Sequence, residues 1–349
     1  LLALPNRTTI SLPVLRKVKE LVAAGATVVG TKPARASGLN NAAQNDAEVK
    51  QLADELWGQK LIIADRAARD VLLAKGVKPD FEIVGTNLPA QFNYLHRVVE
   101  SADIYFVANR STNQDNVRCT FRVAGKAPEL WNPVTGAHQF ATAYEENDGR
   151  TTIPLDFAPC GSWFVIFRDP AAKHPATATS NSPQFTPLTE LAGPWTVKFD
   201  PKWGGPESAT FEQLVSWTAR PERGIKFYSG TATYTKTFDL PDSAIRNPRS
   251  ALFLDLGNVR ELAEVKLNGK SCGITWSPPF RVDISGAVKP WANQLEIEVV
   301  NFWPNRIIGD ASLPLAQRRT RTNIRKLTAD TSLMRSGLLG PVQILEQGK

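Results

Sequence analysis

The stretch of residues 259–310 constrains the fold of this chain more than any other part of its sequence. From Ala263 to Leu267, apolar and charged residues alternate strictly, which predicts a strand with one face in a core and one in water. Asn268-Gly269 follows at once, and this dipeptide favours the two-residue type I′ turn of a β-hairpin. A second alternating run covers residues 294–301. The stretch therefore predicts a meander of short antiparallel strands.

The length of the chain indicates more than one domain. At 349 residues it exceeds the usual single-domain size, and a prior of about 150 residues per domain suggests two or three. No run approaches the roughly 20 apolar residues that span a bilayer, so we expect no membrane-embedded segment and no membrane partner. The opening LLALPNRTT lacks the charged-then-apolar order of a signal peptide, and we expect the chain to begin inside a domain.

Residues 1–88 alternate between helical and strand patterns. Three segments have apolar residues at helical spacing, and two short apolar runs resemble buried strands, in the order 11–24, 27–30, 47–56, 61–64 and 66–74. This order predicts the end of a truncated α/β domain of the Rossmann or flavodoxin-like kind. The segment GTKPAR after the first strand has one glycine and a proline, so it does not form a phosphate-binding loop.

The rest of the chain is predicted to be mainly β. Residues 89–168 hold five short strand patterns between turn-rich segments, which predicts a small β-sandwich. Residues 169–188 are rich in Pro, Ala, Ser and Thr, and we expect a linker there. Residues 189–349 hold six of the nine tryptophans and further strand patterns that predict a jelly-roll β-sandwich. The expected fold class is therefore multidomain and mainly β.

The net charge of +7 is concentrated near the C-terminus. Residues 301–349 hold eight Lys and Arg against three Asp and Glu. Most of this excess comes from Arg318, Arg319, Arg321, Arg325 and Lys326. Such a cluster could bind a polyanion, but a solvated or docked loop is more common, and we expect no nucleic-acid partner.

Cysteine and histidine give no sign of a disulfide or a metal site. Cys119, Cys160 and Cys272 are odd in number and widely spaced, which favours buried free thiols. His138 and His174 lack a second ligand at metal spacing, so we predict no metal site and no cofactor. A calcium ion held by backbone carbonyls, as in some jelly rolls, would leave no signal in the sequence.

Long motifs along nearly the whole chain resemble one family of enzymes. Those of the C-terminal part are FDPKWGGPES, GIKFYSGTATYTKTFDLP, AEVKLNGKSCGITWSPPFRVDIS and NFWPNRIIGD. Those of the N-terminal part are VLRKVKELVAAGATVVGTKP, DAEVKQLADELWG, HRVVESADIYFVANRS and APELWNPVTG. The chain is thereby similar to the C-terminal portion of the α-L-rhamnosidase-like enzymes of glycoside hydrolase family 106. Its last sandwich resembles the galactose-binding-like, sugar-binding jelly roll of family 2 glycosidases.

The resemblance implies carbohydrate chemistry and places the catalyst elsewhere. In such enzymes the two catalytic carboxylates lie on an upstream barrel, and no part of this chain has the pattern of that barrel. The implied function is that of a non-catalytic portion of a glycoside hydrolase acting on rhamnose-containing oligo- or polysaccharides. That portion would support its own missing catalytic domain, in a full-length protein that is secreted or periplasmic.

Two pairs of carboxylates are close in sequence and are candidates for a local catalyst. Glycosidases need two carboxyl groups about 5 to 9 Å apart. Glu145-Glu146 fall in a polar loop, and Glu261 and Glu264 fall on strand or turn edges, where surface carboxylates are ordinary. We therefore assign no catalytic residue to this chain.

The strongest candidates for contact with sugar lie in NFWPNRIIGD. Trp303 offers an apolar face to the C–H side of a sugar ring, and its polar neighbours offer hydrogen bonds to hydroxyl groups. These neighbours are Asn301, Asn305, Arg306 and Asp310. The same residues could instead close one end of the sandwich against the missing barrel.

Four residues elsewhere are weaker candidates. Trp276, and Trp203 beside two glycines, could stack on a sugar, whereas Trp195 and Trp217 are expected in the core. The dipeptide His96-Arg97 could donate hydrogen bonds to a sugar or a barrel carboxylate, or could cap a domain junction. Besides polyanion binding, two alternatives to the main interpretation remain open: an independent carbohydrate-binding module, and domains that serve only as packing layers.

Overall fold

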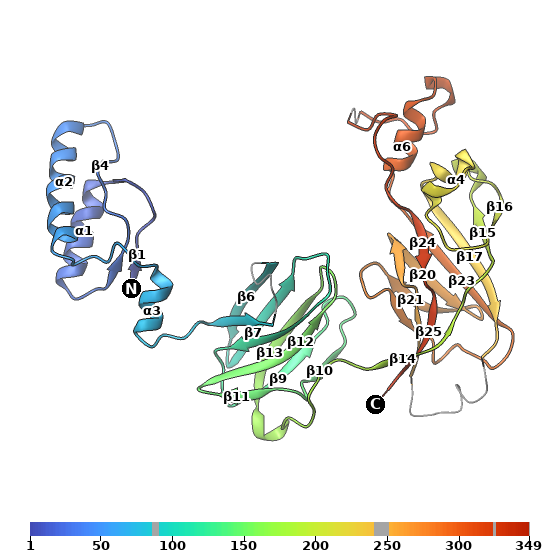
Figure 1. Ribbon diagram of the computed structural model, residues 1–349, viewed down its shortest axis with the longest axis horizontal. Coiled ribbons are helices and arrows are strands. Elements are labelled where there is room, and N and C mark those ends of the chain that lie inside the picture. The colour runs from blue at the N-terminus through green and yellow to red at the C-terminus, as the bar shows by residue number, and fades with distance from the viewer. Residues whose placement is uncertain (86–90, 241–250, 324–325, 349) are drawn as a thin grey trace. The chain divides into compact units, whose positions relative to one another are not determined.

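The computed structural model describes residues 1–85, 91–240, 251–323 and 326–348. The chain divides into two compact units, Leu1–Glu82 and Ile83–Lys349. The first unit is α/β, and the second holds two β-sandwiches (Figure 1). The predicted fold class, multidomain and mainly β, is confirmed. None of the helices in the described ranges is long and apolar enough to cross a membrane.

The first unit packs two helices against short parallel strands. Its elements are β1 (Leu2–Ala3), β2 (Thr9–Ile10), α1 (Leu12–Ala23), β3 (Val28–Val29), β4 (Arg35–Ala36), α2 (Ala42–Gly58) and α3 (Ala68–Ala74). β1 pairs with β3 and β2 with β4, both in parallel. Helices α1 and α2 lie side by side (Figure 1), and Leu15 of α1 and Val49 of α2 are fully buried in the core of this unit.

The strand expected at residues 61–64 does not form. Only Ile63 pairs, through an isolated parallel bridge to Val29, and Leu61 is exposed. The reason lies at the end of α2, where the backbone N–H groups of Leu61 and Ile62 both donate to the carbonyl of Leu56. These donors complete the helix terminus and are not available to a sheet.

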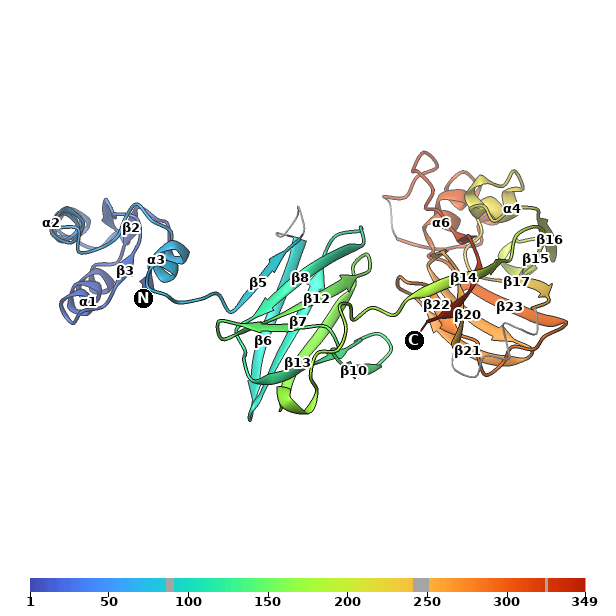
Figure 2. The same cartoon turned by 60° about the horizontal axis from the view of Figure 1, so that its bottom comes forward.

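The small sandwich consists of two facing antiparallel sheets (Figure 2). In the described residues the sheet orders are β10-β9-β13-β7-β6 and β11-β12-β8-β5. The strands are β5 (Phe81–Val84), β6 (Phe92–Val99), β7 (Ala102–Asn109), β8 (Asp115–Phe121), β9 (Lys126–Trp131), β10 (His138–Phe140), β11 (Glu145–Asn147), β12 (Arg150–Phe157) and β13 (Ser162–Pro170). Tyr105 and Phe167 of one sheet meet Phe121 of the other, with ring centroids 4.9 Å apart for Tyr105–Phe121.

The segment predicted as a linker is mostly exposed, but it is tied to both sandwiches. After β13 and the short 3₁₀ helix η2 (Ala171–Lys173), Asn181 ties the chain back to the small sandwich. Its amide oxygen accepts from the backbone N–H groups of Thr142 and Ala143, each at 2.8 Å. Residues 185–188 belong to a strand of the next sandwich. The polar composition of this segment thus reflects docking through side-chain amides as well as solvation.

The C-terminal sandwich is a jelly roll of a four-stranded and a six-stranded sheet among the described residues, ordered β14-β25-β18-β22 and β16-β15-β17-β23-β20-β21. Its strands are β14 (Phe185–Glu190), β15 (Trp195–Phe199), β16 (Ser208–Phe211), β17 (Thr231–Phe238), β18 (Ala251–Asp255), β19 (Asn258–Arg260), β20 (Leu262–Leu267), β21 (Lys270–Thr275), β22 (Arg281–Asp283), β23 (Asn293–Val300), β24 (Gly337–Gly340) and β25 (Gln343–Gln347). Its helical turns are η3 (Pro201–Trp203), η4 (Trp217–Ala219), α4 (Arg223–Lys226), α6 (Pro304–Ala311) and η5 (Leu315–Gln317).

The predicted hairpin and core tryptophans are present. Strands β20 and β21 are joined by Asn268-Gly269, whose φ angles of 54° and 78° are those a type I′ turn requires. Trp195 and Trp217 are almost fully buried in the jelly-roll core. The inward-facing residues of β20 and β23 fill the same core, as the alternation predicts.

The cysteines differ from expectation at one position. All three are free, and Cys119 is buried in the small sandwich, where desolvation raises the pKa of its thiol. Cys272 is half-buried, but Cys160 is exposed. Cys160 has a left-handed φ of 54° in the tight turn between β12 and β13, so the expectation of a buried thiol is wrong there.

Candidate functional site

The ends of five neighbouring strands place three tryptophans at one end of the six-stranded sheet. Across β15, β17, β23, β20 and β21 a single row of paired residues runs Phe199, Ala232, Val299, Ala263, Thr275. Trp203, Trp303 and Trp276 follow this row by one to four residues in the chain. Sequence reasoning singled out these three separately, and the strand register gathers them.

All three side chains, together with Phe302, are open to solvent. The exposed fractions are 48% for Trp203, 59% for Trp276, 56% for Phe302 and 76% for Trp303. We refer to these four residues as the aromatic end. The pairs β23–β20 and β20–β21 separate Val299 and Thr275, the residues of the row that precede Trp303 and Trp276, by two strand spacings, about 10 Å. Phe302 was not predicted, although it lies beside Trp303 in the same motif.

A buried amide network fixes the chain where it leaves β23. Asn301 is 5% exposed; its side chain accepts from the Gly230 N–H at 3.0 Å and donates to the Tyr228 carbonyl at 2.9 Å and to Ser336 Oγ at 3.0 Å. Asn305 is 1% exposed and bonds both the N–H and the carbonyl of Met334. The two asparagines, which the sequence suggested as sugar ligands, therefore have hydrogen-bond partners inside the protein. Through these bonds they fix the backbone on both sides of Phe302 and Trp303.

The helix that follows begins at this network. Trp303 is the N-cap of α6 and Pro304 occupies its first turn, where a missing N–H carries no penalty. The hydroxyl of Ser229 donates to the Phe302 carbonyl at 3.0 Å and accepts from the Arg306 N–H at 3.2 Å. No local pattern marks Ser229 or Ser336, because the residues that they join in this network, Phe302 and Asn301, lie more than 30 residues away in sequence.

Arg306 and Asp310 connect α6 to the loop that carries Trp203. The guanidinium Nη2 of Arg306 donates to the Trp203 carbonyl at 2.7 Å, and its Nη1 lies 3.9 Å from Asp310 Oδ1. Burial lowers the pKa of Arg306, and the nearby Asp310 carboxylate opposes that shift. The other oxygen of Asp310 accepts from Thr320 Oγ1 and from the N–H groups of Thr320 and Arg319. Both charged side chains thus hold α6, the Trp203 loop and residues 319–320 together.

Two arginines of the basic cluster near the C-terminus, Arg318 and Arg319, also hold loops in place. Arg319 Nη1 donates to the Lys202 carbonyl at 2.7 Å, beside Trp203. Arg318 Nε donates to the Leu313 carbonyl at 2.8 Å and so closes the turn after α6. Arg325, which was counted in this cluster, lies outside the described residues. At least two of these cations therefore stabilise loops that support the aromatic end.

Four further candidates lie in the small sandwich. His96, in β6, stacks on Tyr105 with ring centroids 3.9 Å apart, and its Nε2 lies 3.2 Å from Asp103 Oδ1. Arg97 is exposed on the same strand. Glu145 pairs with Arg118, and Glu146 accepts from the Gly125 N–H at 2.7 Å. Within the described residues, no group of three or more His, Cys, Asp or Glu side chains is placed to hold a metal ion.

Comparisons with known proteins agree with the resemblance drawn from the motifs. Residues 1–146 match the family model of the α-L-rhamnosidases of glycoside hydrolase family 106. Residues 220–332 match the galactose-binding domain-like model of glycosyl hydrolase 2. This second match contains Trp276, Trp303 and the whole of α6.

The similarity extends along the chain but covers only part of each relative. The structure of a rhamnosidase from Novosphingobium sp. PP1Y is 35% identical, with a TM-score of 0.79, over 97% of this chain and 32% of that one. A protein of Formosa agariphila, whose name provisionally assigns it β-glucuronidase activity, is 22% identical over 98% of this chain and 50% of its own length. The chain thus spans about a third and a half of these two proteins. By these matches the chain is similar to part of an α-L-rhamnosidase-like glycoside hydrolase of the family 106 type, with a family 2-type galactose-binding-like jelly roll.

Proposed function

We propose that this chain is a non-catalytic portion of a glycoside hydrolase acting on rhamnose-containing glycans, and that its aromatic end contacts carbohydrate. The observation that carries the proposal is the row of strand ends that delivers Trp203, Trp276 and Trp303 to one side of the jelly roll. The carbonyl of Trp203 accepts from Arg306 and that of Trp303 from Ser229, while all three rings are open to solvent. Rigid aromatic surfaces of this kind suit the apolar faces of sugar rings.

Support of a catalytic barrel is the second part of the proposal. Strand β6 lies at the edge of its sheet in the described residues, and four of its apolar side chains are exposed. These are Tyr94, Leu95, Val98 and Val99, at 45%, 53%, 63% and 56% exposure. Proteins normally cover or charge such an edge. An apolar edge strand therefore supports packing against a further part of a longer enzyme, which we propose to be secreted or periplasmic.

Binding measurements on the isolated chain test the carbohydrate contact. We expect binding to a rhamnose-rich polysaccharide, measured by affinity electrophoresis or calorimetry, and about tenfold weaker binding for Trp303→Ala, because stacking residues at the centre of a contact dominate its energy. Trp203→Ala should also weaken binding. The matched control is Trp291→Ala: Trp291 is 64% exposed but precedes β23, whose eight residues separate it from Trp303 by about 26 Å.

The outcomes separate the proposal from its alternatives. An equal loss of polysaccharide affinity in Trp303→Ala and Trp291→Ala would contradict the proposal that the aromatic end is the binding surface. Absence of sugar binding by the folded wild-type chain would favour domains that serve only as packing layers. Tight binding by the jelly roll, independent of any catalytic domain, would favour a carbohydrate-binding module.

A further inference from the structure

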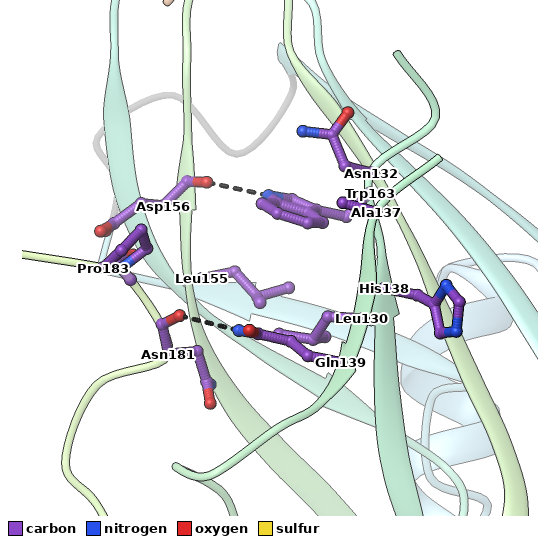
Figure 3. Close-up of a pocket in the computed structure, with 11 residues that line it drawn as sticks. Leu130, Asn132, Ala137, His138, Gln139, Leu155, Asp156, Trp163, Asn181 and Pro183 are labelled. Carbon is purple, nitrogen blue, oxygen red and sulfur yellow. Dashed lines mark hydrogen bonds between the residues drawn. The ribbon is translucent and has the colours of Figure 1, made fainter. Parts of the chain in front are cut away.

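We propose that the small sandwich holds a site for one small neutral aromatic molecule of the size of phenol. The site is a pocket with a volume of about 180 Å³, and it lies among strands β9, β10, β12 and β13 and residues 181–183 (Figure 3). An apolar cavity of roughly 150 Å³ is enough to take up a benzene ring. None of the described residues that line the pocket belongs to the aromatic end.

The inner walls of the pocket are apolar. Leu130 of β9 and Leu155 of β12 come from opposite sheets, and each is 2% exposed. Trp163 of β13 pairs with the fully buried Val107 and therefore faces inward as well. Its indole N–H donates to the backbone carbonyl of Asp156 at 2.9 Å, which fixes the ring between the two sheets (Figure 3). An aromatic ligand can therefore contact an indole ring and two leucine side chains, which shield it from water.

The titratable side chains of the lining point away from these apolar walls. The carboxylate of Asp156 accepts from Asn116, which pairs with it across β12 and β8, and both side chains lie on the outer face of that sheet. The ring of His138 stacks on Trp131 with centroids 4.7 Å apart, and it points away from the leucines in Figure 3. A charged ligand would lose its hydration between the leucines without gaining a partner. The pocket therefore selects a neutral molecule.

One amide oxygen at the edge of the pocket remains available to a ligand. Gln139 donates through Nε2 to the Asn181 carbonyl at 3.4 Å, and its Oε1 has no protein partner in the described part of the chain (Figure 3). The side chain of Asn181 is engaged, because its oxygen accepts from two backbone N–H groups and its Nδ2 donates to two carbonyls. The amide of Asn132 points away from the leucines in Figure 3.

This arrangement suits a phenol better than a sugar. A sugar carries several hydroxyl groups, and most of them would be buried without a partner between Leu130, Leu155 and Trp163. A phenol has a single hydroxyl, which can donate to Oε1 of Gln139 while the ring lies among the apolar side chains. The site thus differs in ligand class from the carbohydrate contact proposed for the aromatic end.

Titration of the full chain with phenol and with toluene, followed by saturation-transfer NMR, tests the site. We expect a Kd on the order of 1 mM for phenol. Gln139→Met keeps the length of the side chain and removes the amide oxygen. It should lower the affinity for phenol relative to that for toluene by about threefold to tenfold, because a single hydrogen bond is lost and toluene never makes it.

Two further variants locate the binding. Leu130→Phe fills the pocket and should weaken the binding of both ligands at least about tenfold, in a chain whose circular dichroism matches that of wild type. Gln139→Met leaves the core intact, so it decides the question if Leu130→Phe does not fold. Trp303→Ala should bind phenol as wild type does, because the aromatic end takes no part in this site.

The contradicting results are equally specific. Absence of saturation transfer to phenol and toluene at about ten times the expected Kd would overturn the site, and so would loss of phenol binding in Trp303→Ala. An unchanged ratio of phenol to toluene affinity in Gln139→Met would overturn the hydrogen bond to Gln139. Displacement of phenol from the wild-type chain by D-glucose would overturn the assignment of an aromatic ligand.

Discussion

Trp217→Ala is expected to lower the free energy of unfolding of the C-terminal sandwich by about 3–5 kcal/mol, the range for truncating a buried aromatic residue. Trp217 is fully buried, and its indole N–H donates to the hydroxyl of Tyr234 at 2.6 Å. Its ring meets Phe199 and Tyr228 edge to face, each at 5.6 Å between centroids. Gly337 has a φ of 100°, and a Cβ there would lie 2.4 Å from Trp217 Nε1, so the core is closed around this ring.

Denaturant unfolding followed by tryptophan fluorescence measures this loss, and Trp303→Ala is the matched control. The same substitution at a residue that is 76% exposed should change the free energy by no more than about 0.5 kcal/mol. A similar loss in both variants would contradict the assignment of Trp217 to the core and Trp303 to the surface. Far-UV circular dichroism of both variants at low denaturant verifies that each begins from a folded state.

Arg306→Ala is expected to lower the free energy of unfolding by about 2–3 kcal/mol. The substitution removes the hydrogen bond to the Trp203 carbonyl and leaves the Asp310 carboxylate, which is 2% exposed, without its nearest cation. Breaking a buried ion pair usually costs about 3–5 kcal/mol, but the 3.9 Å separation and the three donors to Asp310 Oδ2 reduce the loss. The aromatic end should also lose sugar affinity, because Trp203 is no longer held.

Thermal unfolding and sugar binding measured on the same samples test this prediction. The control is Arg321→Ala, since Arg321 is exposed and its removal should change stability by no more than about 0.5 kcal/mol. If Arg306→Ala were as stable as wild type, the buried pair would not hold α6 against the Trp203 loop. Retained stability with lost sugar binding would instead indicate that Arg306 contacts the ligand directly.

The features that were predictable from the sequence depend on neighbours in the chain. The period-two pattern of Ala263 to Leu267 and the Asn268-Gly269 turn give the hairpin because strand and turn preferences are local. The neighbouring residues in the chain also indicated which tryptophans are buried: Trp217 is in the core, and Trp203, beside two glycines, is exposed.

The features that were missed depend on distant partners. Asn301 and Asn305 look like surface sugar ligands in the sequence, but the chain brings Ser336 and Met334 to their amides. The row of strand ends that unites three tryptophans depends on sheet register, which one sequence does not determine when the partner strands are unknown. The residues after α2 formed a helix terminus where a strand was expected, because Leu56 supplied a nearer acceptor than any strand.

Hydrolysis of an aryl α-L-rhamnoside by the purified 349-residue chain tests the central claim most directly. We propose that this chain holds no catalytic carboxylate pair, so release of the aryl alcohol should match the rate in buffer at every protein concentration. Turnover that rises in proportion to the concentration of folded chain, and that is lost in an Asp or Glu variant, would contradict it. In that case the active site would lie in these residues and not in another part of a longer enzyme.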